Sequence, residues 1–325
     1  MARAALERGA EGAARPGDPM RGHLAMLAFS ALVAGSFSLG TMIANDIAPV
    51  AVTAFRFVLA GAIIGAAAAL GPGFRRRHFR APWRYLLVGA LFGSYFVLMF
   101  EGLKTAEPVS TAAVFTLTPI MSGVFAYLIL GQVATRRMAL ALAVGAAGAV
   151  RVIFRAGLSA LLAFEIGRGE GVFFIGCIAH AAYPPLLRRL NRGEPALVFT
   201  FAMMLGALAV MAAYGWGAIR ATDWLALSPF VWAVLVYLSL FASAATFVLL
   251  QYAAMRLPSA KVMAYTYLTP SWVILWEIAL GRGAPPALVM AGIALTVAAL
   301  MLLLKDEDRP APEAPPAGTP RTRRG

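Results

Sequence analysis

Arg56, His180 and Glu277 are ionisable side chains that lie within long apolar runs of this 325-residue chain. In a membrane, a central charged residue costs about 2.5–3.5 kcal/mol and needs a partner or a water-filled cavity. Arg56 would either bind the carboxylate of a solute or tie helices together through their carbonyls. His180 would either relay protons and contact a solute or be a satisfied structural histidine. Glu277 would either couple protons or belong to an interfacial aromatic belt.

Hydroxyl, aromatic and proline residues at similar depth in these runs suit contact with an organic solute of mixed polarity. Together with Arg56 and His180, the binding candidates are Ser36, Tyr95, Thr118, Pro119, Tyr183, Ser243, Tyr265, Thr266, Thr269 and Pro270. The same residue types also serve helix packing, so the alternative role for each is purely structural. The proton-coupling candidates are His180 and Glu277.

Two of these prolines lie near the centres of apolar runs, in FTLTP (115–119) and TYLTP (266–270). Inside a helix, proline leaves the carbonyl four residues back, that of Phe115 or Thr266, without its usual donor. In hydrocarbon such a group must be satisfied by protein, water or ligand. A helix broken at mid-depth beside a wet cavity would satisfy it, and a kink that only improves packing is the alternative.

The composition requires a lipid environment, because 61% of the residues are hydrophobic and only 13% are charged. A spanning helix needs about 20 mostly apolar residues. Ten spans are predicted, at 23–44, 48–70, 85–103, 108–130, 138–154, 171–187, 195–217, 230–255, 258–280 and 286–304. The chain is therefore predicted to be an all-α polytopic membrane protein.

The net charge of +13 does not indicate a nucleic-acid partner, because the arginines lie in the predicted loops. With the N-terminus in the cytoplasm, twenty cations fall on that side and five on the other. This asymmetry follows the positive-inside rule and predicts that both termini are cytoplasmic. The segment 1–22 lacks the apolar core of a signal peptide, with Met20 as an alternative start, and the Pro-rich tail 305–325 is predicted to be disordered.

The two LTP motifs reveal an internal duplication. A shift of 151 residues sets Pro119 against Pro270, and Pro49 similarly meets Pro195. Each copy has five spans, and an odd number forces the second copy to cross the membrane upside down. Inverted repeats of this kind place a solute site near the midplane, between the repeats. The predicted boundaries are 1–22, 23–154 for the first repeat, 155–170 for a linker, 171–304 for the second repeat and 305–325.

Three segments carry a resemblance to a known family: APVAVTAFRF (48–57), LKTAEPVSTAAVFTLTPIMSGVFAYLILGQ (103–132) and AAMRLPSAKVMAYTYLTPSWVILWEIALG (253–281). Over residues 23–304 the chain resembles the EamA domain of the drug/metabolite transporter superfamily. The resemblance implies ten helices in two inverted five-helix repeats around a central cavity. It also implies transport of small organic solutes such as amino acids, other metabolites or drugs, mostly outward, and it says little about which one.

The chain departs from the family pattern at two positions. Gly131 and Gly281 are followed by Gln132 and Arg282, where family members commonly have glutamate. A role in ion pairing therefore does not carry over to these positions. Arg56 matches a frequent arginine of the second helix in the family.

The sequence predicts a secondary transporter that moves a small organic metabolite or drug across a bacterial inner membrane by alternating access, as an exporter. The alternatives are an uptake permease or facilitator, and, in a different class, a membrane-embedded enzyme or a non-transporting receptor. Enzyme activity is disfavoured because the sequence has no H-E-x-x-H motif, thiol pair or phosphate-binding loop. We expect no cofactor or metal, and as partners a small-molecule substrate, the lipid bilayer, coupled protons and a second copy in a homodimer.

Overall fold

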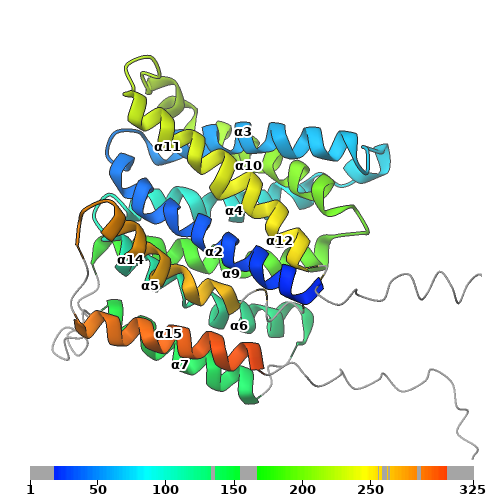
Figure 1. The fold of residues 1–325 in the computed structure, drawn as a ribbon. Helices are drawn as coiled ribbons and strands as arrows, with labels where there is room; N and C mark the ends of the chain where they lie inside the picture. The colour runs from blue at the N-terminus through cyan, green and yellow to red at the C-terminus, as the bar shows by residue number, and fades with distance from the viewer. Residues whose placement is uncertain are drawn as a thin grey trace, which may run out of the picture.

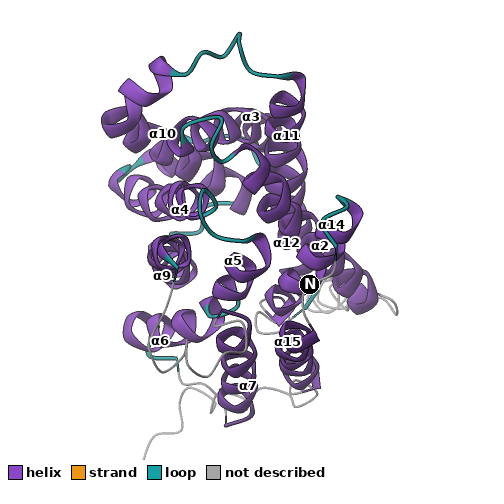
Figure 2. Cartoon of the chain, turned by 90° about the vertical axis from the view of Figure 1, so that its left-hand side faces the viewer, coloured by secondary structure: helices purple, strands orange, loops and turns teal. Residues whose placement is uncertain are grey.

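The computed structural model describes residues 18–132, 136–153, 167–254, 256–257, 262, 264–283 and 287–305. All regular elements in these ranges are helical, and none of the described residues forms a strand (Figures 1 and 2). Three predicted segments lie partly outside the described residues. These parts are residues 1–17 of the N-terminal segment 1–22, residues 155–166 of the linker 155–170, and residues 306–325 of the tail 305–325.

The first repeat contains α2 (Asp18–Ile43), α3 (Pro49–Leu70), the short 3₁₀ helix η1 (Arg76–Phe79), α4 (Trp83–Gly102), α5 (Pro108–Phe115), α6 (Thr118–Leu130) and α7 (Arg136–Ile153). The second contains α9 (Arg168–Leu190), α10 (Ala196–Ala221), α11 (Pro229–Ser239), the π-helix η2 (Leu240–Ala245), α12 (Thr246–Ala254), the 3₁₀ helix η3 (Tyr265–Leu268), α14 (Thr269–Ala279) and α15 (Ala287–Lys305). Each predicted span coincides, within its described part, with one helix or one interrupted helix. This confirms an all-α membrane protein of two five-helix repeats.

Seven of these spans are long and apolar enough to cross a membrane by length and composition alone. The helices α7 and α15 contain shorter apolar stretches, Ala139–Arg151 and Ile293–Leu302. Proline supplies many of the helix starts, since its fixed φ suits the first helical position and its missing N–H is not needed there. It is the first residue of α3, α5 and α11.

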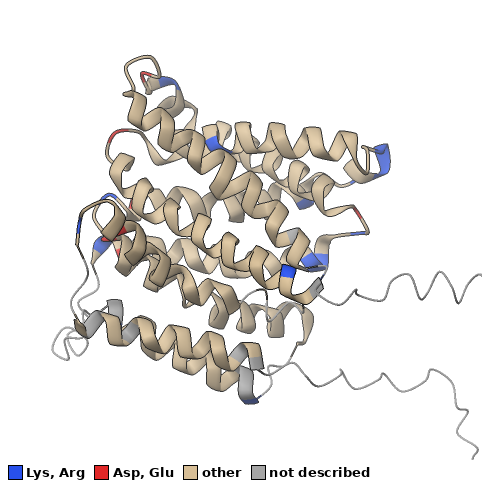
Figure 3. Ribbon diagram, viewed as in Figure 1, with Lys and Arg blue, Asp and Glu red and all other residues tan. Residues whose placement is uncertain are grey.

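Successive spans run in opposite directions, so the loops alternate between the two ends of the bundle (Figure 1). We call the end where the described chain starts and stops, with loops 71–82 and 191–195, the termini face. The opposite face carries loops 44–48, 103–107 and 222–228. Figure 3 shows the arginine-rich turn after α3 on the termini face, in agreement with the alternation predicted from the sequence.

The two repeats contact each other closely where α4 crosses α10. Gly89 and Gly206 face the other helix there, and a Cβ added to Gly89 would overlap the backbone oxygen of Met203. A Cβ on Gly206 would likewise overlap the carbonyl oxygen of Tyr85. Only glycine permits this separation between the backbones, as is common where membrane helices pack.

Both predicted proline sites are real helix breaks. The helix α5 ends at Phe115, two turn residues follow, and α6 restarts at Thr118 with Pro119 as its second residue. In the second repeat η3 ends at Leu268 and α14 restarts one residue later, with Pro270 again second. Each proline thus lies in the first turn of a new helix rather than inside a continuous one, where it would remove a hydrogen bond.

Candidate functional site

A cavity of about 640 Å³ lies between the two repeats. Its lining comes from α2, α3, α4, α5, α6, α7, α9, α10, η2, α12 and η3. This volume is within the range of about 300–1,000 Å³ that is usual for small-molecule sites. The resemblance implies a lining from the first, third, fourth, sixth, eighth and ninth spans. Each of these spans contributes to the described lining, and α3, α7 and α10 also contribute.

The cavity reaches the termini face and ends before the opposite face. Gln132, Arg188 and Asn191, at the termini-face ends of α6 and α9, belong to its lining. At the other end the fully buried rings of Phe37 and Phe173 have their centroids 5.9 Å apart. No described residue of loops 44–48, 103–107 or 222–228 lines the cavity, so within the described residues the cavity opens to the termini face only.

Arg56 is almost completely buried, with 1% of its surface exposed, and lines the cavity. Its Nε donates to the hydroxyl of Ser243, and its Nη2 donates to the carbonyl oxygen of Ala242 at 2.6 Å. Both acceptors lie in the π-helix η2. A π-turn displaces carbonyls from the regular α-helical pattern, which makes them available to outside donors.

The third guanidinium nitrogen, Nη1 of Arg56, has no hydrogen-bond partner among the described residues. The guanidinium carbon lies 4.0 Å from the centroid of Phe96, within the range of a cation–π contact. The two roles considered for Arg56 are therefore compatible in this geometry. Two nitrogens join the repeats, and one remains available to a solute.

His180 lies within an aromatic group on the cavity wall. Its ring centroid is 4.4 Å from that of Tyr95, 5.5 Å from Phe115 and 6.2 Å from Tyr183. Its Nδ1 is buried and has no hydrogen-bond partner in the part of the chain that the structure describes. This placement differs from that of a structural histidine with both ring nitrogens satisfied.

The structure divides the predicted site residues into two sets. The cavity lining contains Ser36, Arg56, Tyr95, Pro119, His180, Tyr183, Ser243 and Thr266. Five predicted residues are not among the described residues of the lining: Thr118, Tyr265, Thr269, Pro270 and Glu277. Thus most candidates from the first repeat meet in the cavity, and most of those from the ninth span do not.

Two of the residues outside the lining have hydrogen-bond partners elsewhere, and the hydroxyl of a third, Thr118, has none among the described residues. The hydroxyl of Tyr265 is 2.8 Å from Nδ1 of His23. Glu277 accepts a hydrogen bond through Oε2 from Arg282 at 3.1 Å. Thr118 is fully buried, with its hydroxyl beside the thiol of Cys177.

Sequence reasoning missed much of the apolar wall. Phe92, Phe96 and Met99 line the cavity from α4 alongside Tyr95. Their spacing of three and four residues places them on one face of a helix, and this periodicity was the available signal. In a span that is apolar on every side, however, spacing alone does not distinguish the cavity face from the lipid face.

A buried ion pair on the termini face was also missed. Arg84 Nη2 lies 2.7 Å from Glu194 Oε1, and Arg84 Nη1 donates to the carbonyl oxygen of Leu190 at 2.5 Å. Burial alone would raise the pKa of Glu194, but hydrogen bonds from Arg84 and from the backbone N–H of Arg192 lower it below its ordinary value. This pair fixes the start of α4 to the loop between α9 and α10.

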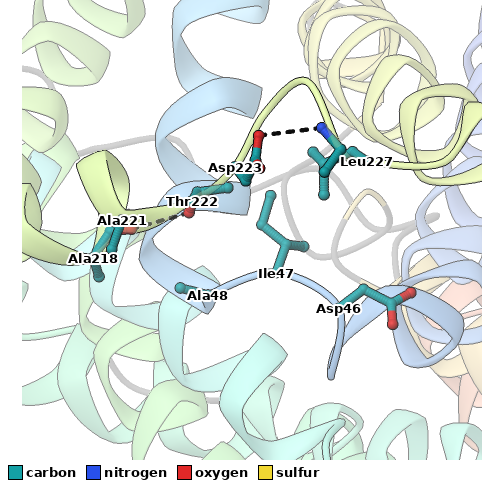
Figure 4. Close-up of a pocket in the computed structure, with 9 residues that line it drawn as sticks. Asp46, Ile47, Ala48, Ala218, Ala221, Thr222, Asp223 and Leu227 are labelled. Atoms are coloured by element: carbon teal, nitrogen blue, oxygen red, sulfur yellow. Dashed lines mark hydrogen bonds between the residues drawn. The ribbon is translucent and has the colours of Figure 1, made fainter.

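The corresponding corner on the opposite face is hollow. A surface pocket of about 480 Å³ lies between the α2–α3 loop and the α10–α11 loop (Figure 4). Asp223 accepts a hydrogen bond from the backbone N–H of Ala226 at 3.2 Å, and Thr222 donates to the carbonyl oxygen of Ala218 at 3.0 Å. This pocket shares no lining residue with the central cavity. Within the described residues, no group of three or more metal-ligating side chains is present.

The sequence model of the EamA-like transporter family matches residues 20–154 and 167–305 of this chain. An uncharacterized transporter of Bacillus subtilis (strain 168), YyaM, is 26% identical over 193 residues, which cover 58% of this chain and 63% of that protein. The match therefore spans less than two thirds of that relative. A protein crystal structure with 23% sequence identity has a TM-score of 0.62, covering 89% of this chain and 96% of that one. This structural likeness shows the fold alone.

Proposed function

We propose, from the premise that this chain belongs to the EamA-like transporter family, that it exports a small organic solute across the plasma membrane of a bacterium. The central cavity is the binding site, and transport proceeds by alternating access without a catalytic step on the solute. One observation carries this proposal. Within the described residues, the central cavity has unpartnered buried polar groups, is open to the termini face and is closed by packed aromatic rings toward the opposite face.

The charge distribution supports the orientation. The termini face carries the arginines of the α3–α4 connection and of the end of α9 (Figure 3). By the positive-inside rule this face is cytoplasmic. The cavity is then open to the cytoplasm, as an exporter requires for loading and an importer for release, and the proposed outward direction rests on the family resemblance.

The experiment is solute flux in proteoliposomes, using a panel of amino acids, nucleosides and cationic dyes with and without a pH gradient. Ser122→Trp fills the cavity from α6, whereas Val124→Trp, on the same helix, changes a side chain that is 53% exposed on its outer side. We expect flux to be lost in the first variant and kept in the second. Equal flux in both variants would contradict the cavity as the transport path.

We further propose that His180, rather than Glu277, couples transport to protons. His180 lines the cavity and has an unpartnered Nδ1, whereas Glu277 pairs with Arg282 outside it. The titratable and charged groups around His180 are Tyr95 on α4 and Tyr183 on its own helix, and Arg56 and Arg188 also line the cavity.

The pH dependence of flux tests this assignment. His180→Asn retains a polar side chain that does not titrate, so we expect a flattened pH profile. Glu277→Gln should leave the profile unchanged, because this carboxylate lies outside the described cavity lining and its Oε2 pairs with Arg282, although its Oε1 has no partner among the described residues. A flattened profile only in Glu277→Gln would reverse the assignment.

A further inference from the structure

The charged groups that line the central cavity are all cationic. Arg56 and Arg188 belong to the lining, and none of its described residues is aspartate or glutamate. None of the ion pairs formed by described residues involves Arg56. A buried guanidinium without a counter-ion is costly, since the desolvation of the charge is not repaid by an ion pair. This cavity therefore favours a solute that brings a negative charge.

The guanidinium of Arg56 is held in a fixed orientation by its two contacts with η2. The remaining Nη1 has no partner although it is buried. Ser36, from α2, also lines the cavity, is 2% exposed and has a hydroxyl without a partner. A carboxylate accepts charge-assisted hydrogen bonds from both kinds of donor, and these bonds are roughly twice as strong as neutral ones.

The surface beside Arg56 is aromatic. The ring of Phe96, which Arg56 covers, lies 5.1 Å from Phe92, and Phe92 lies 5.0 Å from Tyr183, between centroids. Tyr95 lies 4.7 Å from Phe96 on the same helix. These rings form a continuous apolar wall that leads from the buried charge toward the cavity mouth.

From this arrangement we infer that the transported solute is an organic anion. Its carboxylate binds Nη1 of Arg56, and its apolar or aromatic body lies against Phe92, Tyr95, Phe96 and Tyr183. This inference rests on the proposed function and specifies the solute class for the same cavity. The described lining has no carboxylate that could pair with a cationic drug, and Arg56 would repel such a drug. A zwitterionic amino acid would leave its ammonium group without an ion-pair partner among the described residues.

The test compares four probes of one shape: 3-phenylpropionate, its neutral amide 3-phenylpropionamide, the cation 3-phenylpropylamine, and zwitterionic phenylalanine. Binding to the full-length protein in lipid nanodiscs is measured by calorimetry. We expect the acid to bind at least about tenfold more tightly than the other three, as a hydrogen bond to a charged group implies. Equal or tighter binding of the amide, the amine or phenylalanine would overturn the inference, and so would the absence of binding by all four.

Two variants assign the preference to Arg56. Arg56→Gln removes the charge, so the acid should lose about tenfold in affinity while the amide changes little. Arg56→Lys keeps the charge and should retain a preference for the acid. The control Arg220→Gln removes an exposed arginine near the opposite face and should change nothing. An unchanged acid preference in Arg56→Gln would overturn the role of this residue, and the wild-type comparison stands even if that variant does not fold.

Failure of this inference is distinguishable from failure of the proposed function. If another solute class is transported and Ser122→Trp blocks that flux, the proposed transport function is supported and the inferred organic-anion class is wrong. If a solute of the panel is transported and Ser122→Trp has the same flux as Val124→Trp, the cavity is not the transport path.

Discussion

The two broken spans have nearly the same backbone but different surroundings. The residue before each restarted helix is a leucine, with φ −78° and ψ −16° at Leu117 and φ −81° and ψ −13° at Leu268. Pro119 nevertheless lines the cavity, and Pro270 is buried outside it. For these two spans, the difference therefore lies in their placement rather than in the backbone angles at the break.

The proposed alternating access would be an exchange of these two placements between the repeats. If the repeats exchange their placements, the α14 span takes the position that the α6 span has here, and the cavity then opens on the opposite face. Residues such as Thr269 and Pro270, which are outside the lining in this conformation, would enter it. Inverted repeats make such an exchange possible because either repeat can adopt either placement.

The first way to break the comparison is to separate the repeats where they touch. Gly89→Leu would place a side chain into the backbone of α10, so we expect no folded protein. The matched control is Gly171→Leu on α9, where an added Cβ meets nothing within 4 Å. Size-exclusion profiles of the two variants in detergent provide the measurement, and a normal profile for Gly89→Leu would contradict the close crossing.

The second prediction compares two ion pairs, one buried on the termini face and one partly exposed. Glu194→Gln leaves Arg84 buried without its counter-ion and should destabilise the protein by about 3–5 kcal/mol. The control, Glu101→Gln, removes a partly exposed partner of Lys104 and should cost under about 0.5 kcal/mol. Thermal unfolding of both variants measures the difference, and equal losses would show that the corner pair is not structural.

The same carboxylate predicts a pH dependence of stability. The pKa of Glu194 is lowered in the folded state, so its contribution is present above the unfolded pKa of about 4.3 and is lost as the pH falls through the lower folded value. We expect the melting temperature of the wild type to fall more steeply with pH below about 4.5 than that of Glu194→Gln. Parallel curves would contradict this assignment.

The smallest expected effect concerns the breaks themselves. Pro119→Ala and Pro270→Ala should each reduce flux about tenfold, a barrier change of about 1.4 kcal/mol, while membrane insertion stays near the wild-type level. Both breaks are needed if the repeats exchange roles. Loss of flux in Pro119→Ala alone would mean that the second break serves packing only.

Much of the fold could be predicted from the sequence, because span length, loop charge and the repeated LTP motif are local patterns. The position of each break followed from proline chemistry. The cavity wall could not be predicted in the same way. Arg56 donates to Ser243, 187 positions away, within the π-helix η2. No residue spacing in the sequence predicts this π-helix.

The ion pair between Arg84 and Glu194 illustrates the same limit. Aligning Pro49 with Pro195 places Ala48 opposite Glu194. The first repeat therefore has no acidic residue at the equivalent position, and the repeat pattern does not predict the ion pair. Similarly, Tyr265 and Thr269 were predicted in the cavity from their depth in the span. Depth is a property of the sequence, whereas the direction a side chain faces depends on the placement of the whole repeat.

The central claim is that equivalent positions of the two broken spans take turns in lining one cavity. Ser122 lies three residues after Pro119 and lines the cavity, and Val273 lies three residues after Pro270 and is fully buried. The most direct measurement is labelling of Ser122→Cys and Val273→Cys, each in a Cys177→Ala background, with a membrane-impermeant thiol reagent applied to either side of the membrane. We predict that Ser122→Cys reacts from the cytoplasmic side, and that Val273→Cys reacts from the outside only during transport. Protection of Ser122→Cys from both sides, or of Val273→Cys throughout transport, would contradict the account.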